Sequence, residues 1–188
     1  MAEIGIGIVG GGYMGKAHAV AYRAVGAVFD TALKPRLEMV AATSAASAER
    51  YRAAYGFARG TANWRELVND PKVEAVVIAS PQSTHREVAE AAFAMGKPVF
   101  CEKPLGRNVT ESEAMVAAAK GHINMVGFNY IRTPASQYAL QLLQEGRIGE
   151  ITYFRGEMTE DFLATLMPPP PGAVRTWPTG VSVIFPRI

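Results

Sequence analysis

The apolar positions up to Gly149 fall into short runs that alternate with amphipathic or alanine-rich segments. Aliphatic runs bounded by Gly or Pro predict buried strands at 4–9, 37–43, 73–79, 99–101 and 123–127. Helical spacing and terminal glycines predict helices at 14–24, 47–55, 64–68, 84–95, 110–120 and 134–145, with a capping box from Thr110 to Glu113. Because strands and helices alternate, the pattern predicts an α/β fold with a parallel sheet covered on both faces.

The pattern changes after Gly149. Residues 151–158, ITYFRGEM, predict a longer and more polar strand with no helix after it. Four consecutive prolines at 168–171 exclude a helix interior or a central strand there. We therefore expect a doubly wound domain at 1–126, the incomplete start of an α+β second domain at 127–164 and a divergent proline-rich tail at 165–188.

Composition narrows the class of protein. Hydrophobic residues make up 49% of the 188 positions, which is enough for a sizeable core. A net charge of +2 with 19% charged residues is too balanced to indicate nucleic acid or a membrane surface as a partner. One Cys and three His are too few for a common structural zinc site, so no metal is expected. The chain reads as a soluble, cytoplasmic protein.

A glycine-rich turn follows the first predicted strand and opens the first predicted helix. It reads Gly10-Gly11-Gly12-Tyr13-Met14-Gly15, a G-x-G-x-x-G pattern in the context that the motif requires. Gly10 permits the tight turn, Gly12 lets a pyrophosphate approach the backbone, and Gly15 lets the helix pack closely on the strand. The free N–H groups of the helix then face the phosphates. We predict a Rossmann-type dinucleotide site that includes Tyr13 and Met14.

The end of the second strand bears on the choice of dinucleotide. Folds specific for NAD usually place an acid there, to hold the ribose 2′-hydroxyl. This chain has Thr43 and Ser44 instead. Small hydroxyl residues do not repel a 2′-phosphate, and Arg50 lies a few residues on, although it also reads as a solvated helix residue. The prediction is NAD(P), with a slight preference for NADP.

Polar residues follow three other predicted strands. They are Ser80-Pro81, Glu102-Lys103-Pro104 and Phe128-Asn129-Tyr130. Ligands of open α/β sheets bind outside the carboxyl ends of the strands, so these segments are expected to line one cleft. Lys103 would bring a positive charge and a proton donor to the reacting centre, and Glu102 would orient Lys103 or hydrogen-bond the ribose.

The segments GGGYMGKAH and VFCEKPLG together resemble the Gfo/Idh/MocA family of oxidoreductases, and the resemblance extends over about residues 4–163. It implies an NAD(P)-dependent dehydrogenase that acts on a sugar, cyclitol or related polyol derivative. It implies that Lys103 is the catalytic lysine, that the Lys103–Pro104 bond is cis, and that Asn129 and Arg132 lie near cofactor and substrate. His85 matches a family position, and a role at the site and a role in the fold both stay open.

The chain departs from the family pattern after Ala164. Family members continue into a large sheet that closes the substrate cleft, mediates homo-oligomer formation and carries the histidine taken as the general acid/base. No histidine follows residue 164 here. Lys103 could serve as the base only if it were buried. We therefore expect a truncated chain, whether a natural short form, a fragment or a frame-slipped product. The alternative to an active enzyme is a catalytically impaired nucleotide-binding fragment.

Overall fold

The structure is a computed structural model that describes residues 2–157. The strands are β1 (Ala2–Val9), β2 (Leu33–Ala41), β3 (Arg59–Thr61), β4 (Ala75–Ile78), β5 (Val99–Cys101) and β6 (Asn124–Val126). The α-helices are α1 (Tyr13–Val28), α2 (Ala45–Tyr55), α3 (Trp64–Asn69), α4 (His85–Ala94), α5 (Val109–Ala118) and α6 (Pro134–Gln144). Two 3-10 turns, η1 (Gln82–Thr84) and η2 (Asn129–Arg132), complete the described elements.

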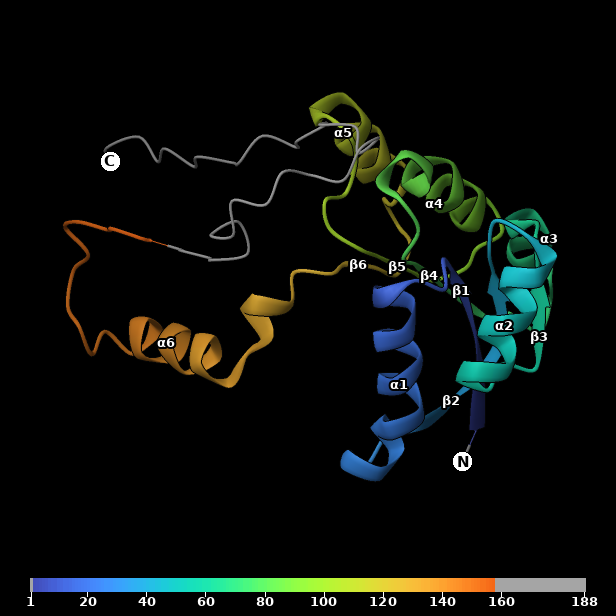
Figure 1. Cartoon of the computed structure of the whole chain (residues 1–188). Coiled ribbons are helices and arrows are strands. Elements are labelled where there is room, and N and C mark those ends of the chain that lie inside the picture. Colours follow the sequence, from blue (N-terminus) through green and yellow to red (C-terminus); the bar gives the residue numbers. More distant parts are fainter. Residues whose placement is uncertain (1, 158–188) are drawn as a thin grey trace, which may run out of the picture. The chain divides into compact units, whose positions relative to one another are not determined.

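The six strands form one parallel sheet in the order β3-β2-β1-β4-β5-β6. The chain builds outward from β1 to β3 and then returns to build outward from β4 to β6 (Figure 1). This order reverses between β1 and β4, and the loops that leave these two strands therefore diverge. The predicted α/β, Rossmann-type doubly wound fold is confirmed.

Each strand of the centre buries side chains on both faces of the sheet. Val9, Met39 and Ile78 pack with residues of α3, α4 and α5 in one hydrophobic cluster. Ile8 and Val40, their neighbours in sequence or register, pack with residues of α1 and α2 in the other. Figure 1 shows α4 and α5 on one side of the sheet and α1 on the other. Burial on both faces explains the continuous apolar runs of these strands.

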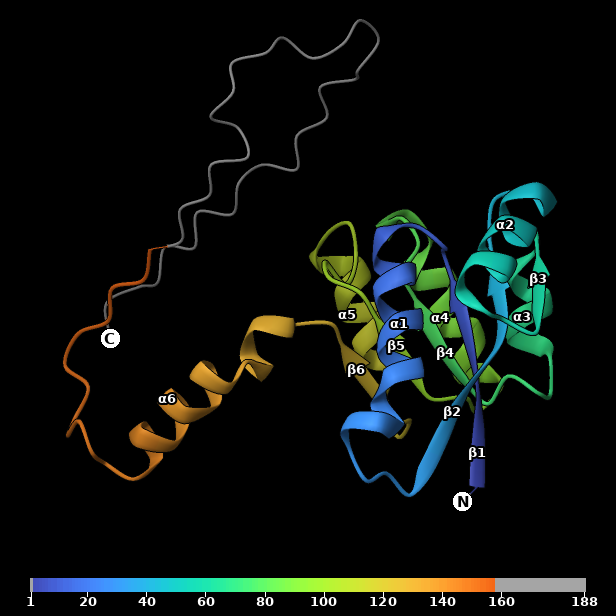
Figure 2. The same cartoon turned by 60° about the horizontal axis from the view of Figure 1, so that its bottom comes forward.

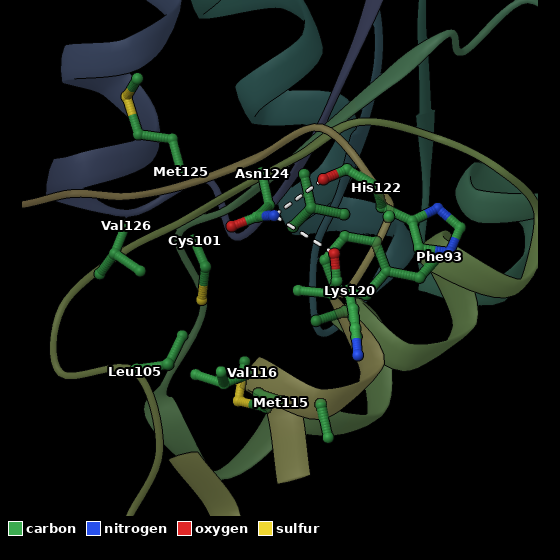
Figure 3. Close-up of a pocket in the computed structure, with 15 residues that line it drawn as sticks. Phe93, Cys101, Leu105, Met115, Val116, Lys120, His122, Asn124, Met125 and Val126 are labelled. Carbon is green, nitrogen blue, oxygen red and sulfur yellow. Dashed lines mark hydrogen bonds between the residues drawn. The ribbon is translucent and has the colours of Figure 1, made fainter. Parts of the chain in front are cut away.

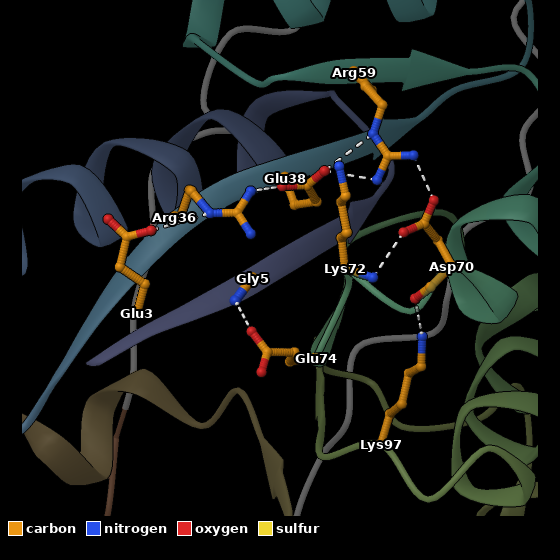
Figure 4. A network of polar contacts seen from close by, with 9 residues as sticks. All are labelled: Glu3, Gly5, Arg36, Glu38, Arg59, Asp70, Lys72, Glu74 and Lys97. Carbon is orange, nitrogen blue, oxygen red and sulfur yellow. Dashed lines mark hydrogen bonds and ion pairs between the residues drawn. The ribbon is translucent and has the colours of Figure 1, made fainter.

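A network of charged side chains joins the short edge strand β3 to the rest of the sheet (Figure 4). Glu38 is only 2% exposed and forms ion pairs with Arg36 and Arg59, the latter at 2.6 Å between Arg59 Nη2 and Glu38 Oε1. Arg59 also forms an ion pair with Asp70, whose backbone carbonyl accepts a 2.6 Å bond from Lys97 Nζ. Both pairings follow from the rule that a buried carboxylate needs charged or hydrogen-bonding partners.

Several boundaries differ from the sequence prediction. β3 was not predicted, because its three residues show no apolar alternation and it is held by pairing with β2. β2 begins at Leu33, four residues before the predicted start, and includes Pro35. β3 pairs only with residues 39–41, so Pro35 lies where β2 has a single neighbour. The capping box from Thr110 was wrong: Asn108 caps α5, accepting a 2.9 Å bond from Glu111 N.

The strand predicted at 151–158 does not form in the part that the structure covers, since residues 151–157 have no regular secondary structure. Residue 158 and the predicted proline-rich tail lie outside the described residues. The sheet and its covering helices belong to a compact unit that ends at Gln141. Among the described helices, none combines the length and apolar character needed to cross a membrane.

Candidate functional site

Gly10 forms the turn between β1 and α1. Its φ of +99° lies in the left-handed region, and a Cβ there would lie 2.6 Å from the Ala79 carbonyl oxygen and from the Ser80 nitrogen. A Cβ on Gly15, in the first turn of α1, would lie 2.0 Å from the Gly10 carbonyl oxygen. These two positions therefore require glycine, which lets β1, β4 and α1 pack closely at the turn.

Gly12 is unconstrained by the protein itself. It is the N-cap residue of α1, and no atom lies within 4 Å of the place that its Cβ would take. The helix has neither a side-chain cap nor an acidic residue in its first turn, so its first N–H groups have no side-chain acceptor. Tyr13, 87% exposed, and Met14 flank this space. The open backbone and the positive helix end fit the pyrophosphate of a dinucleotide.

Two tyrosines of α2 hold the glycine turn in place. The Tyr55 hydroxyl donates a 3.0 Å hydrogen bond to the Gly11 carbonyl oxygen. The Tyr51 ring covers Gly11 so closely that a Cβ there would lie 2.1 Å from a ring carbon. The two rings stack with their centroids 5.5 Å apart. Sequence reasoning missed both residues; their four-residue spacing on a predicted helix was the available signal.

The end of β2 carries the two predicted hydroxyl residues. Thr43 and Ser44 are both exposed, and no acid lies between Ala41 and the start of α2. The Ser44 hydroxyl accepts a 3.2 Å bond from Ser47 N and thereby caps α2. Arg50 is exposed and lies over the Tyr51 ring, with 5.0 Å between its guanidinium carbon and the ring centroid. Ser44 therefore has a structural role as the N-cap of α2, whether or not it also contacts a ribose.

The carboxyl ends of the central strands lie side by side. Backbone hydrogen bonds join Ala79 N to Val9 O (2.8 Å), Glu102 N to Ile78 O (2.9 Å) and Gly127 N to Cys101 O (2.8 Å). Parallel pairing therefore brings the glycine turn, Ser80-Pro81 and Glu102-Lys103 to one edge of the sheet. Gly10 precedes Ser80 by 70 residues and Glu102 by 92, and the register of the sheet makes these segments neighbours.

His85 links the loops that follow β4 and β5. Its Nε2 lies 2.9 Å from the Ser80 carbonyl oxygen, and its Nδ1 lies 3.1 and 3.2 Å from those of Pro104 and Leu105. His85 is 1% exposed. Since both ring nitrogens face backbone carbonyls, the ring has no side available to a substrate. The Lys103–Pro104 peptide bond beside it is cis, as predicted.

Glu102 is buried and Lys103 is exposed, although they are consecutive. Glu102 is 6% exposed, and its Oε1 lies 2.8 Å from His18 Nε2 on α1. Its other oxygen accepts a 3.3 Å bond from the backbone N–H of Lys103. The Lys103 side chain extends into solvent, so the described residues do not supply the burial that a lysine base would need. Sequence reasoning missed His18, which lies one turn after Gly15 in the quoted motif.

Asn129 and Arg132 lie in η2, directly after the carboxyl end of β6. Both residues are exposed. The Asn129 backbone N–H donates a 3.0 Å bond to the Gly127 carbonyl oxygen, which continues the chain past the strand end. No described hydrogen bond or ion pair joins either side chain to the glycine turn or to Lys103. The structure thus places Asn129 and Arg132 at the predicted edge of the sheet. Neither side chain contacts Glu102 or His18 through a described hydrogen bond or ion pair.

Residues 4–130 match the family described as "Oxidoreductase family, NAD-binding Rossmann fold", the GFO_IDH_MocA family. The chain belongs to this Gfo/Idh/MocA family. The resemblance drawn from the glycine turn and the Glu-Lys-Pro segment is therefore confirmed, and the family match covers most of the elements that build the candidate site.

Named family relatives include dehydrogenases of sugars and cyclitols. Levoglucosan dehydrogenase of Pseudarthrobacter phenanthrenivorans is 42% identical over 87% of this chain and 43% of its own length. Inositol 2-dehydrogenase of Rhizobium meliloti is 35% identical over 77% of this chain and 42% of its own. A structure of levoglucosan dehydrogenase in complex with NADH superposes with a TM-score of 0.76 at 41% identity, covering 78% of this chain and 40% of that one. The chain thus spans less than half the length of these Gfo/Idh/MocA relatives.

A cavity of about 470 Å³ lies elsewhere in this Gfo/Idh/MocA domain, between α4, α5, β5 and β6 (Figure 3). It is lined mainly by apolar side chains, such as Phe93, Met115 and Val126, and by the thiol of Cys101. Burial, and next the negative charge of Glu102, raise the pKa of that thiol to about 12. None of the site residues predicted from the sequence lines this cavity.

Proposed function

We propose that this chain carries the cofactor-binding part of an NAD(P)-dependent oxidoreductase that transfers hydride between a nicotinamide and a sugar, cyclitol or related polyol derivative. The observation that supports it most is the meeting of an open, uncapped helix N-terminus at Gly12 with the Glu102-Lys103 turn at one edge of the sheet. The names of the levoglucosan and inositol dehydrogenases support the substrate class.

The residues take distinct roles in this proposal. The turn from Gly10 to Gly15, with Tyr13 and Met14, holds the pyrophosphate, and Ser80 and Pro81 line the path toward the nicotinamide. Lys103 is the catalytic residue, placing a positive charge and a proton donor by the substrate oxygen. A bound dinucleotide would supply the hydride chemistry. Asn129 and Arg132 complete the site on the side of β6.

The 2′-position of the adenosine ribose decides between the two dinucleotides. The exposed Thr43 and Ser44, with no acid beside them, support NADP slightly over NAD. The NAD-binding family and the relative solved with NADH support NAD. We propose that the chain accepts both, with NADPH bound somewhat more tightly. A cytoplasmic location remains part of the proposal, supported by the single cysteine of the chain.

A second candidate function is nucleotide binding without turnover, and the contacts of the three histidines support it. His18 contacts Glu102, His85 contacts backbone carbonyls, and His122 packs against the Phe93 ring with 5.1 Å between centroids. Oxidation of an alcohol needs a base for the hydroxyl proton. Since Lys103 is exposed, the described residues of this chain offer no obvious one.

Titration of the 188-residue chain with NADH and NADPH, followed by fluorescence and thermal unfolding, tests the proposal. Saturable binding is expected, and ligand at about 100 times Kd should stabilise the fold by about 2.7 kcal/mol. Absence of binding by both dinucleotides would reject the proposed function. An assay with NAD⁺ or NADP⁺ and levoglucosan or inositol then separates the candidates, because binding without turnover supports the second one.

A further inference from the structure

The carboxylate of Glu102 is held from two sides by other residues of the protein. One oxygen lies 2.8 Å from His18 Nε2, and the other accepts the Lys103 backbone N–H at 3.3 Å. Gly127 closes a third side, since a Cβ there would lie 3.1 to 3.2 Å from the carboxylate atoms. A buried carboxylate with so little room has one favoured orientation. Its hydrogen bond with the Lys103 N–H links that orientation to the position of the Lys103 backbone.

His18 is itself fixed in position. Its side chain is 15% exposed, and its ring meets the Phe100 ring edge-on with 4.9 Å between centroids. Phe100 lies in β5, two residues before Glu102, so the same strand supports both partners of the pair. His18 belongs to α1, the helix whose N-terminus at Gly12 is the candidate pyrophosphate site. A single rigid helix therefore joins this site to the Glu102 carboxylate.

We propose that His18 is a positioning residue that couples occupation of the α1 N-terminus to the geometry of the Lys103 turn, acting through Glu102. This inference rests on the proposed function, because it assumes that a dinucleotide binds at Gly12. Binding at that end adjusts α1, the His18 ring moves with the helix, and Glu102 transmits the change to the Lys103 backbone. Cofactor binding then adjusts the position of the catalytic lysine.

The test uses the full 188-residue chain, four single variants and the double variant His18→Leu/Glu102→Gln. His18→Leu removes the hydrogen bond, His18→Gln keeps a donor, and Glu102→Gln removes the charge. His122→Leu removes a histidine from outside the pair and serves as the matched control. Each protein is titrated with NADH by fluorescence, its Lys103 amide is followed by ¹⁵N–¹H NMR, and its thermal unfolding is recorded.

In the wild type, NADH is expected to shift the Lys103 amide resonance. His18→Leu should bind NADH about 5- to 50-fold more weakly, the usual range for coupled sites, and its Lys103 resonance should no longer respond. His18→Gln should recover part of both effects, and the double variant His18→Leu/Glu102→Gln should be no worse than either single one. The control should match the wild type in both measurements.

The proposal is overturned if the His18 variants lower only the unfolding temperature while NADH affinity stays within about twofold and the Lys103 response persists, since that describes a merely stabilising pair. If the wild type binds neither NADH nor NADPH, the proposed function fails separately. The ligand-free spectra then decide whether the pair positions the turn: non-additive Lys103 shifts in the His18→Leu and Glu102→Gln variants support it, and unchanged or additive shifts reject it.

Discussion

Gly10 and Gly12, two residues apart in the turn, require glycine for different reasons. Gly10 has a positive φ, and backbone atoms of Ala79 and Ser80, just after β4, lie 2.6 Å from the place of its Cβ, so the fold itself excludes other residues. Gly12 has an ordinary φ of −69° and open space around it, so the fold would accept a side chain there. At Gly12 only a dinucleotide bound as proposed would exclude a side chain, and this distinction can be measured.

We predict that Gly12→Ala weakens NADH binding at least about tenfold, because the methyl group occupies space where the pyrophosphate approaches the backbone. Loss of stability should stay below about 1 kcal/mol, the difference between Gly and Ala at an N-cap. Gly26→Ala, in the same helix and also with no atom near its Cβ, is the matched control and should leave Kd unchanged. Equal affinity of Gly12→Ala and wild type would show that the dinucleotide binds elsewhere.

Gly10→Ala should give the reverse result. The left-handed backbone and the contact with Ala79 and Ser80 should cost about 1–3 kcal/mol or more in the free energy of unfolding. Urea denaturation of the ligand-free protein measures this cost. A variant with wild-type stability would contradict the close packing between the glycine turn and β4.

Residue-scale prediction from sequence succeeded where the signal is local. The glycines of the turn and the cis bond before Pro104 follow from short motifs, and the structure places them as expected. The His18–Glu102 pair joins residues 84 positions apart, and a single sequence gives no information on such a contact. Glu102 was expected to orient Lys103 or to hydrogen-bond the ribose, and the structure shows in addition that His18 contacts the Glu102 carboxylate.

Among the elements, β3 shows how a strand can form without an apolar pattern. Its residues Arg-Gly-Thr pair with residues 39–41 of β2, and Arg59 joins Glu38 to Asp70. The hydrogen bond and charge of Arg59 lower the pKa of Asp70 from 3.8 to about 2. A lowered pKa in the folded state stabilises the protein above the unfolded pKa, and this contribution is lost as the pH falls toward 2.

Asp70→Asn is therefore expected to lower the unfolding temperature at pH 7 by several degrees, equivalent to about 1–2 kcal/mol. The difference from wild type should shrink below about pH 4 and vanish below about pH 2, where the wild-type carboxyl becomes protonated as well. Glu49→Gln, at an exposed pair with Arg52, is the control and should change the unfolding temperature by about 1 °C or less. A pH-independent difference would place the stabilisation outside the ion pair.

Element boundaries were predicted well where apolar periodicity is strong and poorly where tertiary contacts decide. The alternation of strands and helices was correct, because burial on both faces gives continuous apolar runs. Pro35 in β2 and the short β3 depend on which strand lies beside them, which the local sequence does not contain. Residues 151–157 have the composition of a strand but pair with none of the described strands, and an isolated strand is unstable by itself.

At the scale of the molecule, the complete sheet, both hydrophobic clusters and every predicted site residue belong to the unit that ends at Gln141. A chain that ends at residue 145, just past α6, should therefore fold and bind NADH with a Kd within about threefold of that of the 188-residue chain. Circular dichroism and the same titration check this. An insoluble product or a lost affinity would show that later residues contribute to folding or to the site.

The rate at which a reagent labels the thiol of Cys101 can report how often the sheet opens. Cys101 is the single cysteine of the chain, it is 3% exposed in β5, and its raised pKa leaves almost no thiolate at neutral pH. Because the thiol lines the cavity between α4, α5, β5 and β6, a thiol reagent is expected to react when these elements move apart. The labelling rate measures how often these openings occur. A slower rate after addition of a dinucleotide would show that the bound protein opens less often.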